Sequence, residues 1–418
     1  MQENDITKIL GLQGVKTIKI SYEENEVKIE IEPEDGHQDC PCCKSKRTKR
    51  NGSDGNRTIR HLPLAGKKCL LIAKRVRCAC NDCGATYAYE YSFVEGKQRY
   101  TKAYKAEMYK QTIGSTTQHT AEVTETPYST VERFFKEIVM KLAPYTSAYA
   151  AKVAQEARKL ILGVDDFAIR KGHNYNTGIH DLRGESLLCV AEGRTIEELR
   201  TYMTKNPQIA RLMPYAIVMD LAQNYHSFAA EFYPKAIRVA DRFHVNGYII
   251  DALNEVRRRV GKSLSSKART NLNRNKHLLN KRNENLTSEQ RVTLKILLAY
   301  SKDLKAVYEL KEQLIDWYDC SYDYASAQTG YDRWCARGHA YNIPEIETAL
   351  KTFEAWRVEI VNYHRCRFTN GIVEGRNGKI KSLQRRHYFL QNRTFYEHLI
   401  ILECNKEIAQ DYFRLLFN

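Results

Sequence analysis

The chain has 418 residues, and 66 lysines and arginines against 50 aspartates and glutamates give it a formal net charge of +16. This length is enough for two to four domains, and the charge favours a polyanionic partner, with nucleic acid first. No apolar run approaches the roughly 18 residues that a membrane span needs, and no secretory signal pattern opens the chain. We therefore expect a cytoplasmic protein without a membrane partner.

Residues 1–95 are predicted to form a β-hairpin and a zinc ribbon. Residues 15–20 and 26–31 alternate apolar and charged side chains around a polar break, as the two strands of a hairpin do. Seven of the 12 cysteines then lie between residues 40 and 83. This clustering indicates a metal site in a reducing compartment rather than a disulfide framework.

The cysteines form two hooks, Cys40-Pro-Cys-Cys43 and Cys80-Asn-Asp-Cys83. Each hook places two thiolates one tight turn apart, as a tetrahedral zinc site requires. A zinc site this small is usually structural, so we assign the module to DNA holding rather than chemistry. The expected Zn²⁺ ligands are Cys40, Cys43, Cys80 and Cys83; Cys78 is the alternative to Cys80, and Cys42 is expected to be a bystander.

Residues 96–155 are predicted to be a helical DNA-binding domain. The spacing is that of a helix-turn-helix, in which Ala121 packs under Val131 and Phe134. Pro127 is placed to open the second helix, where its fixed φ and missing N–H cost little.

The turn of this motif departs from the usual pattern. The position after the first helix usually favours Gly, and here it is Glu125. A plain helical hairpin therefore remains the alternative. If the motif is a helix-turn-helix, the DNA-facing side chains are Tyr128, Ser129 and Arg133.

Residues 156–250 and 361–418 are predicted to form a ribonuclease H-like α/β catalytic core. Apolar runs ending at Asp165-Asp166 and at Asp220 are typical of buried strands. A meander of three strands followed by strand, helix, strand is the order of a ribonuclease H-like sheet, in which the first and fourth strands are neighbours. The expected strands are residues 160–166, 175–182, 186–190, 215–220 and 236–243, and the expected helices are residues 195–205 and 223–232.

A helix is predicted after Thr369 or Asn370, either of which could cap it. Its helical period places Val373, Ile380 and Leu383 on an apolar face. The opposite face carries Glu374, Gly378, Lys381 and Arg385.

Glu374 completes a three-carboxylate metal site with the two strand-ending acids, Asp165 and Asp220. Because the first and fourth strands of such a sheet are neighbours, we expect the two aspartates to lie together. For either aspartate alone, an ordinary strand-ending aspartate that caps the next element is the alternative.

Residues 251–360 are predicted to be a helical insertion, since the strand pattern ends there. Ten basic residues from Arg257 to Arg282 form a tract with few acids. This tract is either a solvated helix face or a surface that follows a phosphate backbone. Apolar residues then recur at helical spacing from Val307 to Trp317 and are expected to be core, as are Trp334 and Trp356.

Together these features resemble the transposases of bacterial insertion sequences of the ISL-three type, which carry a DDE triad. The likeness covers nearly the whole chain and includes the zinc ribbon and the helix-turn-helix. Asp166 stands where the family commonly has Glu, which leaves open which aspartate faces the metal. The motifs that carry the resemblance are Val164-Asp165-Asp166-Phe167-Ala168, Asp241-Arg-Phe-His244, Asn370-Gly-x-x-Glu374-Gly-x-Asn377 and the basic end from Lys381 to Tyr388.

The resemblance implies a triad of Asp165, Asp220 and Glu374, with Asp241 and His244 as an auxiliary motif on the fifth strand. Carboxylates suit two Mg²⁺ or Mn²⁺ ions, which together support hydrolysis and transesterification of DNA. The family also implies a bacterial, nucleoid-associated homodimer that binds double-stranded DNA at the element ends and at the target. Further DNA contacts are expected from Lys381, Arg385 and Arg386.

Two other functions explain part of the same pattern. One is a DNA-binding transcriptional regulator with an inactive nuclease-like core, which would not cleave DNA with Mg²⁺. The other is a nuclease that hydrolyses nucleic acid without strand transfer. His244 is either a general base or a core histidine, since a histidine after a strand is commonly a satisfied core residue.

Overall fold

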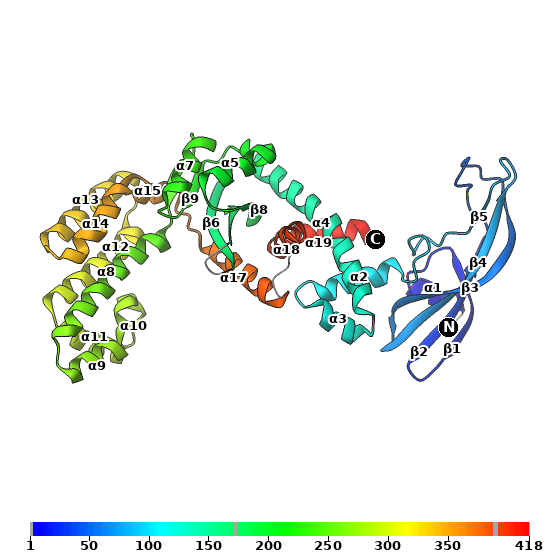
Figure 1. The fold of residues 1–418 in the computed structure, drawn as a ribbon, viewed down its shortest axis with the longest axis horizontal. Coiled ribbons are helices and arrows are strands. Elements are labelled where there is room, and N and C mark those ends of the chain that lie inside the picture. The colour runs from blue at the N-terminus through cyan, green and yellow to red at the C-terminus, as the bar shows by residue number, and fades with distance from the viewer. Residues whose placement is uncertain (1–2, 171–173, 388–391, 418) are drawn as a thin grey trace. The chain divides into compact units, whose positions relative to one another are not determined.

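The computed structural model describes residues 3–170, 174–387 and 392–417. The chain forms two compact units, one of residues 1–142 and 410–418 and the other of residues 143–409. The boundary between them falls within the long helix α4 (Tyr128–Glu156) (Figure 1). Among the described helices, none is both long and apolar enough to cross a membrane.

The first unit contains a five-stranded sheet of order β1-β2-β4-β3, with β5 paired to β4. The hairpin expected near the N-terminus is present as an antiparallel pair, β1 and β2. The longest strands, β3 and β4, were not predicted, and they connect the two cysteine hooks. Its elements are α1 (Glu3–Ile9), β1 (Val15–Tyr22), β2 (Glu26–Pro33), β3 (Thr48–Leu64), β4 (Lys67–Cys80) and β5 (Thr86–Ala88).

Helices α2 (Lys102–Thr112) and α3 (Thr117–Thr124) follow, and a short turn leads from α3 into α4. Ala121 packs in one buried cluster with Val131 and Phe134, as the sequence predicted. Pro127 directly precedes α4.

Glu125 ends α3 in the left-handed conformation, with φ 48°. This is the backbone conformation that glycine adopts most easily. The exposed carbonyls of the turn are bound by the guanidinium of Arg60 on β3, whose nitrogens lie 2.9 Å from the Glu125 oxygen and 2.6 Å from the Thr124 oxygen. Hydrogen bonds from the sheet therefore support a turn that lacks glycine.

The second unit is built on a five-stranded sheet of order β10-β9-β6-β7-β8. The first three strands form an antiparallel meander, and β9 and β10 run parallel to β6. The fourth strand therefore lies beside the first, as expected. The strands are β6 (Ile161–Arg170), β7 (Asn174–Asp181), β8 (Ser186–Glu192), β9 (Ala216–Met219) and β10 (Ile237–Ala240).

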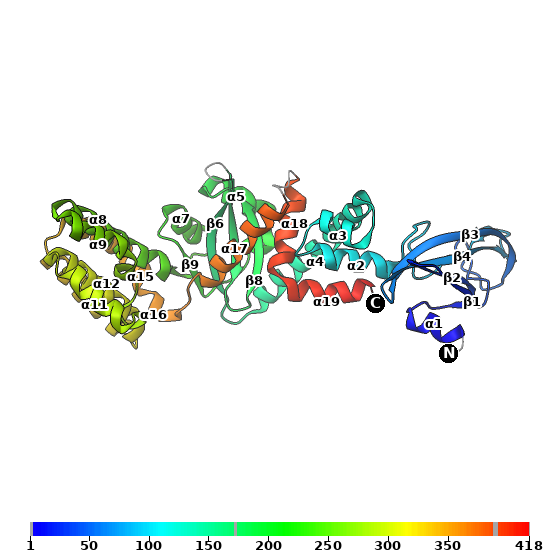
Figure 2. The ribbon, with the colours of Figure 1, turned by 90° about the horizontal axis from the view of Figure 1, so that it is seen from below.

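Helices cover both faces of this sheet (Figures 1 and 2). On one face, Leu199 of α5 and Phe228 of α7 share a core cluster with Leu162 and Val164 of β6. The other face carries α17, which packs on β6, and α18, which packs on β8. These helices are α5 (Ile196–Lys205), α6 (Pro207–Ala210), α7 (Gln223–Phe232), α17 (Gly371–Arg386), α18 (Arg393–Cys404) and α19 (Lys406–Phe417), which runs into the first unit.

All the regular secondary structure between β10 and α17 is helical, as predicted for the insertion. Val307, Leu310, Leu314 and Trp317 of α12 are buried, and Trp334 is 4% exposed, so these residues belong to the core as expected. Trp356 is partly buried against the same core. The helices are α8 (Arg242–Ser263), α9 (Ser266–Arg274), α10 (Lys276–Asn280), α11 (Ser288–Leu298), α12 (Lys302–Cys320), α13 (Tyr324–Ala340), α14 (Pro344–Ala355), α15 (Arg357–Val361) and α16 (Tyr363–Cys366), with a 3-10 turn at Asn283–Asn285.

Candidate metal and catalytic sites

The two cysteine hooks meet in the first unit. The sulfur atoms of Cys40, Cys43, Cys80 and Cys83 all lie within 4.8 Å of one another. Cys40 Sγ is 3.6 Å from Cys83 Sγ, and Cys43 Sγ is 3.5 Å from Cys80 Sγ. Tetrahedral zinc with Zn–S bonds of about 2.3 Å sets its sulfurs about 3.8 Å apart. The four thiols therefore fit a structural zinc ion.

Each hook is shaped by the same backbone turn. The N–H of Lys44 donates to the Cys40 carbonyl and the N–H of Gly84 donates to the Cys80 carbonyl, and both residues have positive φ, 59° and 70°. Hydrogen bonds from the backbone N–H groups of Cys43 and Cys42 lower the pKa of the Cys40 thiol to about 6. The corresponding N–H groups of the second hook lower the pKa of Cys80. Each turn therefore favours a thiolate, the form that binds metal, at its first cysteine. The sulfurs of Cys40 and Cys80 in turn raise the pKa of Cys43 and Cys83.

The other cysteines of this region lie outside the cluster. Cys78 was the alternative to Cys80, but its Sγ is buried 3.8 Å from the Gly36 carbonyl. Burial raises the pKa of Cys78, and it raises that of Cys69 to about 11. Cys42 is exposed, as expected of a bystander.

In the second unit, the register of the sheet brings two acids together. The pairing of β6 with β9 ends at Gly163 and Val218. Asp165 and Asp220 each follow two residues after this last pair. Asp165 was expected at the end of its strand, but β6 continues to Arg170 because its far half pairs with β7. Asp165 is thus in mid-strand, at the point where the pairing with β9 stops.

Asp165, rather than Asp166, faces α17. Asp165 is 8% exposed, and its Oδ2 accepts a hydrogen bond of 2.7 Å from Asn377 of α17. Burial and the charge of Asp220 raise the pKa of Asp165 to about 7. Asp166 points to the other face of the sheet, where its carboxylate lies 3.2 Å from Arg194. Neighbouring residues of a strand alternate between faces, which explains the difference.

Asp241 and His244 lie on a helix, not on the fifth strand as predicted. β10 ends at Ala240, and α8 begins at Arg242 with Asp241 as its N-cap. The Asp241 side chain accepts from the backbone N–H of His244, which favours helix over strand at this point. The aspartate is 0% exposed, and its second oxygen accepts a hydrogen bond of 2.9 Å from the Asn370 N–H.

His244 lies between two carboxylates. Its Nδ1 is 2.8 Å from Asp220 Oδ1 and 3.1 Å from Asp241 Oδ2. Asp220 and then Asp241 raise the pKa of His244 to about 10. Burial raises the pKa of Asp220, and the neighbouring imidazole of His244 opposes this effect. The two carboxylates therefore favour the protonated imidazole.

Glu374 approaches the same cluster from α17. The helix has the predicted faces, because Val373, Ile380 and Leu383 are buried while Glu374 is partly exposed. Burial and the nearby charges of Asp241 and Asp220 raise the pKa of Glu374. The glutamate therefore shares an electrostatic environment with the aspartates.

The most compact group of acids differs from the predicted triad. Outside the cysteine cluster, the part of the chain that the structure describes holds one group whose ligand atoms lie within 4.8 Å of one another, and it consists of Asp220, Asp241 and His244. Asp165 and Glu374 lie beside this group rather than in it, since the charge of Asp220 acts on both. We call these five residues together the acid site.

Two asparagines hold the acid site together, Asn370 directly before α17 and Asn377 within it, and neither was predicted to have this role. Asn370 was a predicted cap, but its side chain makes no cap bond and donates to the Val164 carbonyl at 3.1 Å. Gly163 leaves room for it, because a Cβ there would lie 2.8 Å from Asn370 Oδ1. Asn377 follows Glu374 by three residues, so it shares that side of the helix. The three-residue spacing from Glu374 is the sequence feature that could have identified Asn377 as part of the site.

The structure also places the predicted DNA-contacting side chains. Tyr128, Ser129 and Arg133 are exposed on the first turns of α4. On α17, Lys381 and Arg385 are exposed, whereas Arg386 is paired with Glu403 of α18. Tyr388, which ends the basic motif, lies outside the described residues.

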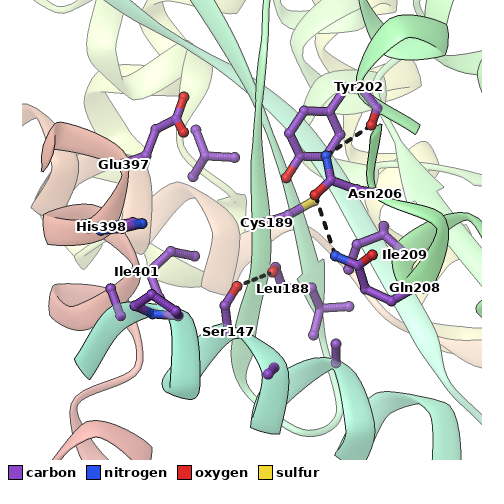
Figure 3. A pocket seen from close by; sticks show the side chains of 15 residues that line it. Ser147, Leu188, Cys189, Tyr202, Asn206, Gln208, Ile209, Glu397, His398 and Ile401 are labelled. Atoms are coloured by element: carbon purple, nitrogen blue, oxygen red, sulfur yellow. Dashed lines mark hydrogen bonds between the residues drawn. The ribbon is translucent and has the colours of Figure 1, made fainter. Parts of the chain in front are cut away.

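A separate cavity of about 380 Å³ lies in the second unit between β8 and α18 (Figure 3). Its lining includes Ser147 of α4, Cys189 of β8 and Glu397 of α18. None of the residues of the acid site lines it. The cavity is therefore not the candidate catalytic site.

Known proteins match both parts of this chain. Residues 162–400 match the ISL3 transposase family, and residues 37–83 match the zinc finger of the transposases of IS204, IS1001, IS1096 and IS1165. The transposase for insertion sequence element IS1001 of Bordetella parapertussis is 26% identical over 347 residues, which are 81% of this chain and 82% of the relative. The transposase for IS1557 of Mycobacterium tuberculosis is 24% identical over 247 residues, 54% of this chain and 55% of the relative.

The family match spans more than half of the chain and contains Asp165, Asp220 and Glu374. The chain belongs to the ISL3 family of DDE transposases. It is accordingly a DNA-cleaving and strand-transfer enzyme, and the comparisons favour neither a regulator nor a nuclease without strand transfer.

Proposed function

We propose that this transposase cuts the terminal inverted repeats of an insertion sequence and joins the freed ends to target DNA, using Asp165, Asp220 and Glu374. The observation that carries the proposal is the acid site. Asp165 and Asp220 follow the last paired residues of β6 and β9 and lie together. They share their electrostatic environment with Glu374 of α17. These acids come from three distant parts of the sequence, which a capping role for each alone does not explain.

The acid site fits hard divalent cations. Carboxylate oxygens are the ligands that Mg²⁺ and Mn²⁺ prefer. Asp220 Oδ1 is buried and, although 2.8 Å from His244 Nδ1, lacks the alignment of a hydrogen bond. Two such ions, when bound, activate the attacking oxygen and stabilise the leaving oxygen. We propose that carboxylate oxygens of Asp165, Asp220 and Glu374 hold these two ions.

The other residues of the acid site are positioning residues in this proposal. Asn377 holds the Asp165 carboxylate, and Asp241 joins the start of α8 to the residue before α17. Water or a 3′-hydroxyl attacks phosphorus, and one P–O bond breaks for each that forms. The protein therefore needs no nucleophile of its own.

The finer assignments of fold belong to the same proposal. The strand order of the second unit supports a ribonuclease H-like core, and the α3–α4 turn supports a DNA-binding helix-turn-helix that presents Tyr128, Ser129 and Arg133. Lys381 and Arg385 would contact DNA phosphates, and we assign Arg386 a lesser part because Glu403 already pairs with it. We also propose a homodimer that pairs two element ends and works at the bacterial nucleoid.

The test is strand cleavage of a labelled duplex that carries an element end, with Mg²⁺ or Mn²⁺. Asp220→Asn and Glu374→Gln should each lose more than the roughly 10- to 100-fold that loss of an outer partner of a metal ligand costs. Glu289→Gln, an exposed acid on α11, is the matched control and should cleave normally. Cleavage by Asp220→Asn at the wild-type rate would remove the basis of the proposal, and cut ends that never join would favour the nuclease.

A further inference from the structure

Phe243 is an exposed aromatic side chain beside the acid site. It stands on the first turn of α8 between Asp241 and His244, and it is 63% exposed. Its ring centroid lies 5.7 Å from that of His244, with the planes at 84°. Arg242, by contrast, turns into the helical insertion and pairs with Asp319 at 2.7 Å. Among residues 241–245, Phe243 alone is exposed rather than buried or half-buried, and it lies next to the acids.

One position beside this ring on the helix surface carries no side chain. Residues four apart are neighbours on a helix surface, and the residue four after Phe243 is Gly247. A Cβ at Gly247 would meet nothing within 4 Å. Glycine destabilises a helix interior relative to alanine, so helix stability does not explain its presence. The ring and the open surface next to it leave room for a flat group.

A nucleobase is the flat group that the substrate of this enzyme supplies. Aromatic side chains stack on unpaired bases, and apolar wedges unstack neighbouring base pairs. A phosphodiester held at Asp220 would bring its flanking base within reach of a ring one residue from His244. We propose that Phe243 stacks on a base beside the phosphodiester that is cut and holds that base out of the duplex. This inference rests on the proposed function of the acid site.

The first test compares wild type, Phe243→Ala and Phe243→Trp on two duplexes. One duplex is fully paired, and the other lacks the flanking base at an abasic site. On paired DNA, Phe243→Ala should cleave roughly 5- to 150-fold more slowly, the factor that corresponds to the loss of one base–aromatic stack. Phe243→Trp should retain activity. On abasic DNA the wild type and Phe243→Ala should cleave alike, because neither has a base to stack.

A second readout measures the base directly. The base analogue 2-aminopurine, placed beside the cleavage position, should brighten when the wild type binds in Ca²⁺ and should stay dim with Phe243→Ala. Gly247→Leu should cover the open surface and slow cleavage of paired DNA, and Gly247→Ala, whose Cβ meets no atom within 4 Å, should not lower the melting temperature. Val292→Ala, an apolar residue 61% exposed on α11, is the control and should behave as wild type.

The outcomes separate this inference from the proposed function. If Phe243→Ala cleaves paired DNA at the wild-type rate, or stays slow on abasic DNA, the stacking role is wrong while the acid site stands. If Asp220→Asn cleaves as well as the wild type, the proposed function fails first and the stacking role fails with it.

Discussion

The cysteine cluster and the acid site are assembled in opposite ways. Each cysteine hook is closed by a turn of its own, in which Lys44 or Gly84 takes a positive φ, and only the meeting of the two hooks is a long-range event. The acid site draws its groups from β6, β9, α8 and α17. Its order depends on hydrogen bonds such as that from Asn377 to Asp165, which are 212 residues apart in sequence.

This difference predicts how each site fails. A change in a hook should abolish one ion and its local fold, because half of the ligands are lost as a unit. A change in the acid site should act in steps, because separate hydrogen bonds hold the carboxylates of Asp165 and Asp241. Four experiments follow, from the largest expected effect to the smallest.

The largest effect is expected from Cys43→Ser. Structural zinc sites contribute an apparent ~10–16 kcal/mol at pH 7, so this variant should lose its zinc and the fold around both hooks. Zinc content by atomic absorption and near-ultraviolet circular dichroism measure the result. Cys42→Ser, one residue away and outside the cluster, should keep its zinc. Full zinc occupancy in Cys43→Ser would show that three thiols suffice.

Asp241→Ala should lower the free energy of unfolding of the second unit by about 2–4 kcal/mol, because α8 loses its cap and the Asn370 N–H loses its partner. Asp241→Asn keeps one acceptor oxygen, which can still accept the hydrogen bond that caps α8, so it should cost less than Asp241→Ala. The chain's three tryptophans all lie in the second unit, so urea unfolding followed by their fluorescence reports on it. Equal losses for the two variants would contradict the capping role.

Asn377→Ala should weaken the acid site without unfolding it. Asp165 would lose its 2.7 Å partner, and loss of such an outer partner typically costs 10- to 100-fold in metal affinity or activity, by order of magnitude. Cleavage measured against Mn²⁺ concentration should therefore shift to higher Mn²⁺. Ser382→Ala, an exposed change on the same helix, is the control. An unshifted Mn²⁺ curve would rule out this role.

The smallest effect is expected from the basic end of α17. Lys381→Ala should reduce the slope of log affinity against log salt by about 1, the loss of one phosphate contact. Arg386→Ala should leave that slope nearly unchanged and instead lower stability, because Glu403 is buried and loses its partner. Filter binding of a DNA duplex across a salt series measures both. A larger slope change for Arg386→Ala would reverse the assignment.

The same contrast explains what the sequence could predict. The hooks, the Ala121–Phe134 packing and the strand before Asp220 depend on residues close in sequence, and all were predicted. β3 was missed because residues 49–56 are polar or glycine and exposed, without the alternation of a strand. These residues are extended because β4 pairs with them.

The acid site was predicted only in part, because its details depend on contacts between distant residues. The short apolar run before Asp241 suits a strand that continues or a helix that begins, and periodicity alone does not distinguish them. The hydrogen bond that Asp241 accepts from Asn370 is made by a residue 129 positions away. Likewise, Asp165 is in mid-strand only because β7 extends β6 beyond β9.

The bond from Asn370 to Asp241 also closes the helical insertion at its base. A second bond of 2.9 Å, from Asn362 to the Arg238 carbonyl, secures the same end. The helical insertion therefore leaves and rejoins the sheet at the same place. Since the entropy of closing a loop grows only with the logarithm of its length, evolution could lengthen, shorten or exchange this insertion at little cost to the stability of the core.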